Sequence, residues 1–486
     1  MQCLSPYTAL QELTSRQPNH EAIVFDDMTV TYGELLERVT NFAGWLLHNG
    51  FEPGQATGLC IRDEIAHIEA ALAVLCLDTA QMSLGSHESG ATRRALARRV
   101  GVTQVIVEKQ EDWMEGLRTI MMPLSDPRNI RGAPAVALGD LFPGRSVDSI
   151  GIYQNTSGST NVPKTFGITL ERLLLLSKRY YADPKERRSL RTGSIEFDAH
   201  RLHRLGLLFA GKSSLFLRQV SLRTLTNFCE RAEVTALHMG AYKLASLVRS
   251  EGQTGGRLPS FTTVHTGGLR VPGPLRKDLK RVLTDNLYVL YATSEIGMIS
   301  RATPDQHDSF PEGVGYPAAG VTLEIVDPNG EQFAPGEIGQ IRVRKAGAPE
   351  DYIAEPGLRS NFQDGWFYPR DLVSYRPGEP LIFHGRADDV MILNGINIFP
   401  SAIEDTLESH HDVQEAVAFA IKSRIHGEIP VAAVVLKDTA KIRDAAHLLD
   451  FCRQALGIRA PREVVVVDSI PRNSAGKPLR RELAGS

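Results

Sequence analysis

Residues 153–164 read YQNTSGSTNVPK, a stretch whose residue types could hold a polyphosphate. Small residues leave backbone N–H groups accessible, hydroxyl side chains donate further hydrogen bonds, and Lys164 adds a positive charge. A flexible surface turn would have a similar composition, so this stretch alone does not decide between the two. The pattern GxxxxGK[ST] of the P-loop is absent, which argues against a P-loop kinase.

The hydrophobic pattern predicts the elements that must position such a loop. Helical spacing over residues 31–50 and 66–78 alternates with short apolar runs that indicate buried strands. These runs lie at 56–61, 102–108, 212–218, 234–240, 261–268 and 286–295. The alternation is typical of βαβ units, so we expect an α/β fold with largely parallel sheets.

The pattern changes in the second half of the chain. From about residue 313 the sequence indicates β-strands joined by a turn at DPNG, which predicts a small β-rich subdomain. After residue 386 a compact α+β unit begins. We therefore expect an N-terminal domain over residues 1–386, built from two βαβ-type subdomains and the β-rich subdomain, and a small C-terminal domain over residues 387–486.

Chain length, net charge and composition argue against several classes of protein. A chain of 486 residues is too long for one typical core, and a net charge of −3 without a basic block gives no reason to expect nucleic acid or a membrane surface as partner. The N-terminus lacks the basic region of a signal peptide, and no stretch approaches the ~20 apolar residues of a membrane span. The five cysteines show no metal-ligand spacing, which favours free thiols in the cytoplasm.

Several motifs in the right order make the chain similar to the adenylate-forming enzymes. This superfamily comprises acyl-CoA synthetases, peptide-synthetase adenylation domains and firefly luciferase, and the resemblance runs from VTYGELLERV to NSAGKPLRREL. It implies a stand-alone ligase that activates a carboxylic acid with ATP and Mg²⁺, releases pyrophosphate and transfers the acyl group to a thiol. The implied acceptor is CoA or the phosphopantetheine of a separate carrier protein. The C-terminal domain is implied to be mobile.

The resemblance also assigns nucleotide-binding residues. The first motif matches the family's phosphate loop TSGSTGxPKG, with Asn161 and Thr165 in place of glycines. In YATSEIG, Tyr291 would lie against adenine, Ser294 would reach the α-phosphate and Glu295 would hold Mg²⁺. The expected metal ligands are Glu295 and Thr160. The expected ATP- or AMP-binding residues are Thr156, Ser157, Gly158, Ser159, Thr160, Lys164, Gly267, Gly268, Tyr291, Ala292, Asp371 and Arg386.

Two further motifs resemble the ribose site and the domain junction. Asp371 in GWFYPRDLV would accept hydrogen bonds from both ribose hydroxyls, although Arg370 replaces a family glycine. Arg386 would contact the ribose or phosphate, and Asp388 would be the hinge about which residues 393–397 swing toward the site. A local surface ion pair is the alternative for Arg386 and Asp388.

Lys477 in PRNSAGKPLRREL matches the family's catalytic lysine. A carboxylate that approaches the α-phosphate of ATP meets another anion, and a lysine between them offsets the repulsion and stabilises the transition state. The expected catalytic residues are Lys477, Ser294 and Glu295. An exposed lysine near a C-terminus would otherwise only add solubility.

The motifs point to more than one class of carboxylic acid substrate. SIEFDAHRLHRLGLLFAGKSSLFL resembles amino-acid-activating domains, where the residue matching Asp198 pairs with the substrate ammonium, but Asp198 could equally cap a helix. GINIFPSAIE looks more like free-standing aryl or acyl ligases, and no carrier domain follows. His265 is either close to the substrate or a core histidine, and the methyl group of Ala292 would narrow the pocket. The expected acyl-site residues are Phe197, Asp198, Leu202, His238 and Thr266.

Departures from the family's pattern leave a second class of function open, a nucleotide-binding homologue that is catalytically weakened. The departures are Asn161, Thr165, Ala292 and Arg370. Four residues expected to do chemistry are retained, and they argue against this alternative. They are Lys164, Glu295, Asp371 and Lys477.

Overall fold

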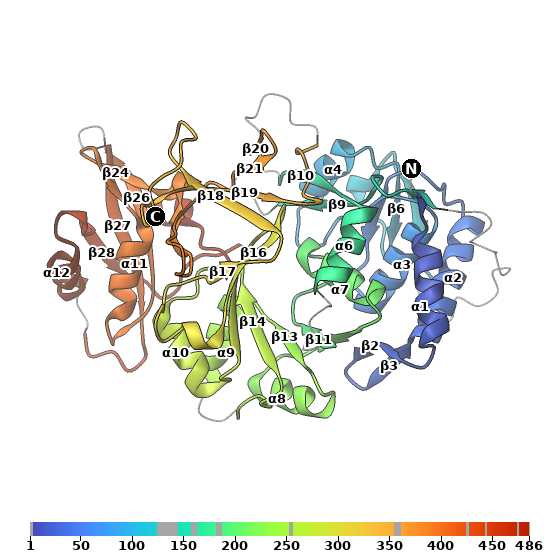
Figure 1. Cartoon of the computed structure of the whole chain (residues 1–486), viewed down its shortest axis with the longest axis horizontal. Helices are drawn as coiled ribbons and strands as arrows, with labels where there is room; N and C mark the ends of the chain where they lie inside the picture. The colour runs from blue at the N-terminus through green and yellow to red at the C-terminus, as the bar shows by residue number, and fades with distance from the viewer. Residues whose placement is uncertain are drawn as a thin grey trace.

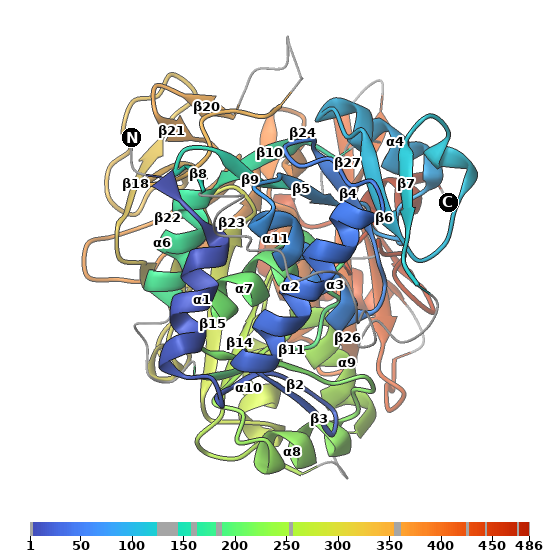
Figure 2. The same ribbon diagram turned by 90° about the vertical axis from the view of Figure 1, so that its right-hand side faces the viewer.

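The computed structural model is an elongated molecule with the N-terminal helices at one end and the C-terminal sheet at the other (Figure 1). Viewed from the N-terminal end, helices Pro6–Arg16 (α1), Tyr32–His48 (α2) and Glu64–Cys76 (α3) lie side by side (Figure 2). The structure describes residues 3–123, 144–156, 163–180, 187–251, 256–353, 361–423, 427–442, 445–473 and 476–485.

A nine-stranded sheet forms the centre of the N-terminal part. Its inner strands are parallel, and antiparallel strands close both edges. In spatial order the strands are Tyr316–Pro317 (β17), Gly297–Ala302 (β16), Leu287–Thr293 (β15), Thr263–Gly267 (β14), Ala236–His238 (β13), Arg188–Arg191 (β11), Ser213–Phe216 (β12), Glu21–Phe25 (β2) and Met28–Thr31 (β3).

A second, six-stranded sheet is also parallel except at one edge, where β10 runs antiparallel to β9. Its strands are Thr165–Thr169 (β10), Ile150–Asn155 (β9), Gln81–Ser83 (β5), Thr57–Cys60 (β4), Gln104–Val107 (β6) and Arg118–Met121 (β7). One apolar core joins the two sheets through α2, α3 and the helix Asp198–Phe209 (α7). The expected α/β fold with largely parallel sheets is confirmed.

A third sheet is antiparallel and corresponds to the predicted β-rich subdomain. It contains Val321–Val326 (β18), Gly339–Lys345 (β19), Phe362–Gln363 (β20), Trp366–Phe367 (β21), Asp371–Ser374 (β22) and Ile382–Arg386 (β23). The fourth sheet has its own apolar core and lies in the C-terminal part. It contains Met391–Leu393 (β24), Ile396–Ile398 (β25), Val413–Ser423 (β26), Gly427–Leu436 (β27) and Glu463–Val466 (β28).

The helices begin and end where local sequence predicts. For α2, Thr31 and Glu34 form a capping box at the start, and Gly50 has φ 80° just after the end, a conformation that favours glycine. The other described helices and the short strand pair are Gly90–Arg99 (α4), Leu170–Tyr180 (α6), Leu222–Arg231 (α8), Ala241–Glu251 (α9), Gly273–Val282 (α10), Pro400–Ser409 (α11), Ala445–Leu456 (α12), Arg480–Gly485 (α13), Cys3–Leu4 (β1) and Arg145–Ser146 (β8).

The cysteines whose side chains the structure describes are free thiols. Cys76, Cys229 and Cys452 are buried free thiols, and Cys60 is a partly buried one. Within the part of the chain that the structure describes, every helix is too short or too polar to cross a bilayer.

Candidate active site

Tyr291 and Asp371 meet where the large sheet faces the antiparallel one. Tyr291 is near the end of β15, Asp371 begins β22, and the Tyr291 hydroxyl donates a 2.7 Å hydrogen bond to Asp371 Oδ2. Both residues are less than 10% exposed. Burial raises the pKa of Asp371 to about 6 and raises that of Tyr291 well above its ordinary value. Asp371 is thus a desolvated carboxylate where two sheets meet, and it is the residue expected to bind the ribose.

Arg386 lies beside this carboxylate because β23 pairs with β22 in a register that sets Arg386 opposite Asp371. Arg386 Nη1 is 3.3 Å from Asp371 Oδ1, and its Nη2 is 3.3 Å from Asp388 Oδ2. Arg370 Nη1 donates a 3.0 Å bond to Asp388 Oδ1. The predicted hinge residue is therefore held by two arginines.

Arg370 has a backbone φ of 63°, in the left-handed region. A glycine adopts this conformation without strain, which explains why the family favours glycine at this position. In this chain an arginine adopts the strained backbone conformation, and its side chain pairs with Asp388. The departure at residue 370 thus has a structural role.

Lys477 is brought to the same site from the far end of the chain. Loss of hydration lowers the pKa of Lys477, and the nearby charge of Arg386 lowers it further. The carboxylates of Asp371 and Glu295 act on it in the opposite sense. More than a third of the side chain remains accessible to solvent, so it stands at the edge of the site rather than inside the core.

Glu295 is 6% exposed, and its Oε1 accepts a 2.5 Å hydrogen bond from the hydroxyl of Tyr352. The ammonium of Lys164 stands 4.7 Å from the centre of the Tyr352 ring, a cation–π distance. Arg172 of α6 donates to the backbone carbonyl of Glu295. Tyr352 therefore joins the lysine of the phosphate loop to the expected metal ligand.

The described ends of the phosphate loop form a hairpin base. Thr156 N donates to Lys164 O at 2.8 Å, and Thr165 is the buried first residue of β10. The Thr165 hydroxyl bonds to Asn155 Oδ1 at 2.8 Å, so this departure is a strand residue rather than a loop residue. The other phosphate-loop positions lie outside the described residues. They are Ser157, Gly158, Ser159, Thr160 and Asn161.

The two expected glycines after β14 are needed for different reasons. A Cβ on Gly267 would lie 2.4 Å from the Leu290 carbonyl oxygen, which no side chain tolerates. Gly268 has φ 80°. Ala292 and Ser294 are exposed at the end of β15, where the pairing with β16 shifts register after Tyr291.

A row of aromatic rings crosses the large sheet on the side where the acyl substrate is expected. The parallel register aligns His238, His265 and Tyr288 on neighbouring strands, with centroid distances of 4.6 Å and 5.1 Å between successive rings. His203 of α7 packs on His238 at 4.6 Å. Burial lowers the pKa of His203 and His238 well below the ordinary value, so both are neutral at pH 7.

The expected acyl-site residues do not all lie on one side of this sheet. Phe197, Asp198 and Leu202 lie at or on α7, the helix that covers the His238 face, and Phe197 stacks on His87 at 4.3 Å. Thr266 follows His265 in β14, and the pleat turns it to the opposite face. Its hydroxyl is buried and has no hydrogen-bond partner among the described residues.

Asp198 uses both carboxylate oxygens within the chain. Oδ1 accepts a 2.7 Å bond from the fully buried Arg201, and Oδ2 accepts a 2.7 Å bond from Asn155 N. Arg201 also donates to Tyr153 O at 3.1 Å. Asp198 thus ties α7 to the strand that leads into the phosphate loop, and an internal guanidinium occupies the place expected for a substrate ammonium.

These features define an α/β protein in which a lysine from the C-terminal part stands close to the bonded set of Tyr291, Asp371 and Arg386. The sequence pattern described as AMP-binding enzyme matches residues 10–353, and that of the AMP-binding enzyme C-terminal domain matches residues 402–477. The chain belongs to the AMP-binding enzyme family, which confirms the resemblance seen in the motifs.

Individual relatives are distant. The chain is 29% identical over 228 residues to a long-chain-fatty-acid–CoA ligase of Salmonella typhimurium, a match to 46% of this chain and 40% of that protein. It is 26% identical to a 2-succinylbenzoate–CoA ligase of Geobacillus kaustophilus over 96% of this chain and 95% of the relative. The structure of o-succinylbenzoate CoA synthetase from Bacillus subtilis with its acyl-adenylate superposes with a TM-score of 0.86 at 21% identity, covering 99% and 98% of the two chains.

Two functional candidates were missed in the sequence. Tyr352 lies outside every motif, and its only signal is an aromatic residue in the polar segment between β19 and β20. Arg201 follows Asp198 at helical spacing, which is a signal for an ion pair along a helix. In both cases the role of the residue depends on a contact that forms only when the chain folds: Tyr352 with Glu295, and the buried Arg201 with Asp198.

Proposed function

We propose that this chain activates a carboxylic acid with ATP to form an acyl-adenylate and pyrophosphate, and then transfers the acyl group to the thiol of CoA. The observation that carries the proposal is the convergence of Lys477 with Asp371, Arg386 and Glu295 from distant parts of the chain. The family match and the CoA ligases among the relatives support it.

In the first step the carboxylate oxygen of the acid bonds to the α-phosphorus of ATP, and the bond to the leaving pyrophosphate breaks. Lys477 offsets the repulsion between the two anions and stabilises the charge that develops. The Asp371 carboxylate accepts hydrogen bonds from the ribose and holds the nucleotide in line. In the second step the thiol sulfur bonds to the acyl carbon, its proton leaves, and AMP departs.

Mg²⁺ fits the residues at Glu295. A buried carboxylate is a hard oxygen ligand of the kind that Mg²⁺ prefers, and Tyr352 orients it by one hydrogen bond. When bound, the ion would neutralise phosphate charge. Glu295 would hold it, Lys164 would bind the outer phosphates, and Ser294 at the end of β15 would face the α-phosphate.

The second half-reaction rests on the expected division of the chain at residue 386 and on rotation about Asp388. In this proposal the rotation breaks the bonds from Arg370 and Arg386 to Asp388, each a partly exposed pair. Residues 393–397 then approach the site. A carrier protein is the alternative acceptor, with the same thiol chemistry.

Two other functions are less well supported. An amino-acid substrate would have to displace Arg201 from Asp198, which would leave a fully buried guanidinium without its carboxylate. A catalytically weakened homologue would not need Lys477 close to the carboxylates of Asp371 and Glu295. Moreover, the departures at Thr165 and Arg370 have structural roles.

Pyrophosphate release with ATP and Mg²⁺ tests the proposal across aryl, fatty, dicarboxylic and amino acids, each with and without CoA. Release with one class of acid, increased by CoA, is expected. Release that ignores CoA would point to a carrier protein. ATP binding without release for every acid would favour the weakened homologue.

A further inference from the structure

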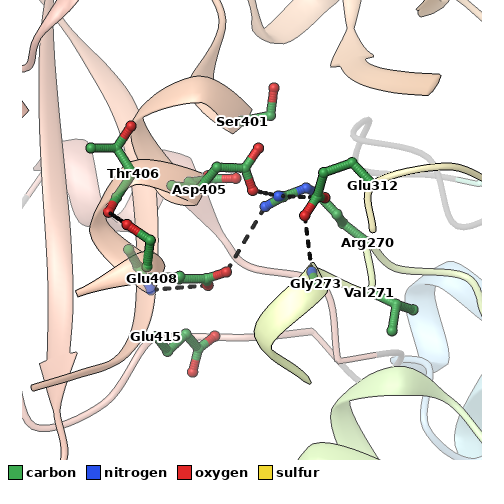
Figure 3. A network of polar contacts seen from close by, with 12 residues as sticks. Arg270, Val271, Gly273, Glu312, Ser401, Asp405, Thr406, Glu408 and Glu415 are labelled. Atoms are coloured by element: carbon green, nitrogen blue, oxygen red, sulfur yellow. Dashed lines mark hydrogen bonds and ion pairs between the residues drawn. The ribbon is translucent and has the colours of Figure 1, made fainter. Parts of the chain in front are cut away.

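Arg270 connects the N-terminal part of the molecule to helix α11 of the C-terminal part. It lies in the loop between β14 and α10, and its side chain is 19% exposed. Figure 3 shows its guanidinium among three carboxylates. It is 3.1 Å from Glu312 of the N-terminal part, pairs with Asp405 of α11, and lies 3.9 Å from Glu408 of the same helix.

The surroundings make this a desolvated cluster rather than a surface pair. Glu312 also accepts a 2.9 Å bond from Gly273 N at the start of α10. Glu408 accepts a bond from Ala416 N, and burial raises its pKa to about 7. Arg270 therefore lies between the carboxyl groups of Glu312, Asp405 and Glu408 and offsets the repulsion among them in a desolvated environment.

Two further contacts join the same parts of the molecule. Arg249 of α9 donates a 3.0 Å bond to Gln414 O at the start of β26. Arg472 pairs with Glu415 and stands 4.4 Å over the ring of Tyr242 in α9. Arg270 thus belongs to an interface that extends along α9, α10 and α11.

Helix α11 is also bonded to the segment that carries the lysine. Its Glu404 accepts a 2.6 Å bond from Arg480, three residues after Lys477. Arg480 also approaches Asp389 beside the expected hinge, at 4.0 Å. A displacement of α11 would therefore move the Lys477 segment with it.

We propose that Arg270 is a positioning residue for adenylation: by binding Asp405 and Glu408 it holds α11 where Lys477 can reach the nucleotide. This rests on the proposed function. Removing Arg270 deletes the attraction and leaves the carboxylate of Glu312 facing that of Asp405, so α11 is repelled from this position. Acyl transfer, which uses the rotated arrangement, does not need the contact.

The activity test separates the two half-reactions. Arg270→Ala is expected to lower acid-dependent ATP–pyrophosphate exchange about tenfold or more, while transfer from a supplied acyl-adenylate to CoA stays within about twofold. Adding Asp405→Asn should restore part of the exchange, because it removes a carboxylate that faces Glu312 once Arg270 is gone. The matched control is Arg231→Ala, an exposed arginine of α8 paired with Asp27 at 2.7 Å, and it should change neither step.

A cross-linking test does not depend on activity. A Cβ at Gly476 would lie 3.3 Å from the Tyr242 Cβ, close to the ~3.5–4.5 Å of a disulfide. The backbone of Gly476 has φ 79°, which strains a cysteine there, so all rates are compared within the double variant Tyr242→Cys, Gly476→Cys. This pair should cross-link on oxidation, and Arg270→Ala should slow the cross-linking while Arg231→Ala does not. The single-cysteine variants control for the native thiols.

The outcomes distinguish the two proposals. If the parent enzyme shows no exchange with any acid, the proposed function fails, and the rate of cross-linking still decides whether Arg270 holds α11. Equal losses in both half-reactions, or an unchanged cross-linking rate in Arg270→Ala, would overturn the positioning role.

Discussion

The proposed site has a nucleotide side and an acyl side, and the two are built in different ways. On the nucleotide side, Tyr291 of β15, Asp371 of β22 and Arg386 of β23 form a continuous bonded set, and the charge of Lys477 from the C-terminal segment acts on it. On the acyl side, the rings of His238, His265 and Tyr288 stack across parallel strands. The first arrangement depends on specific polar partners, and the second depends on strand register.

This difference predicts how each side responds to change. Losing one charge on the nucleotide side leaves others unbalanced, so effects on activity should be large. The pKa of Asp371 is raised to about 6, close to neutral pH, whereas those of His203 and His238 are lowered well below their usual range. Titration near neutral pH should therefore be a property of the nucleotide side.

The largest effect is expected from Lys477→Ala. Removing the cation between the acid and the α-phosphate should reduce acid-dependent pyrophosphate exchange by about 10²–10³-fold. Transfer from a supplied acyl-adenylate should persist, because the phosphorus is no longer attacked in that step. Equal loss in both assays would contradict the assigned role.

Asp198→Ala should act on stability rather than on choice of substrate. It leaves the fully buried Arg201 without its carboxylate, which should lower the free energy of unfolding by about 3–5 kcal/mol. Denaturant unfolding measures this, and Asp198→Asn, which keeps a carbonyl oxygen, should cost less. Normal stability together with loss of activity toward amino acids alone would restore the ammonium role.

Tyr352→Phe should slow adenylation about tenfold, since it removes one hydrogen bond to a buried carboxylate. The ring beneath Lys164 remains, so the phosphate-loop contact is kept. The apparent affinity for Mg²⁺, measured by titrating the metal at fixed ATP, should fall as well. An unchanged metal dependence would separate Tyr352 from the function of Glu295.

Adenosine binding should weaken about fourfold between pH 7 and pH 5.5. Because the pKa of Asp371 is raised to about 6, the carboxylate gains its proton as the pH falls through this range and loses capacity to accept ribose hydrogen bonds. Calorimetric titration with adenosine avoids the titration of phosphate. Asp371→Asn should bind weakly with a flat profile, and a sloping profile would point to another group.

Thr266→Val should have the smallest effect. The shape is kept, and the hydroxyl that is lost has no described partner, so thermal stability should stay the same or rise slightly. The KM for the acid should change by less than about threefold, since Thr266 lies on the face opposite His238. A large change in KM would show that the acid reaches that face.

The comparison also explains what could be predicted from the sequence. Short motifs carry Asp371, Glu295 and Lys477 with their immediate neighbours, and the alternation of helical and strand patterns predicted the α/β fold. The Asp198–Arg201 pair was recognisable only in part. Its helical spacing is local, but the burial of Arg201 depends on packing against distant strands.

Other features had no local signal. Tyr352 contacts Lys164 and Glu295, and even Glu295, the nearer of the two in sequence, is more than fifty residues away along the chain. Arg270 meets α11 across the boundary between two sheets. The stacking of His238 on His265 requires the parallel register of β13 and β14, and the hydrophobic pattern indicates the strands but not how they align.

The buried thiols have a consequence for the fate of the intermediate. An acyl-adenylate is an electrophile, and thiolates, not thiols, are the species that attack it readily. Burial raises the pKa of Cys60 and Cys229 to about 12 and that of Cys452 to about 11. At neutral pH these sulfurs stay protonated, so self-acylation at these cysteines is suppressed and the activated acyl group is preserved for an acceptor that arrives from outside.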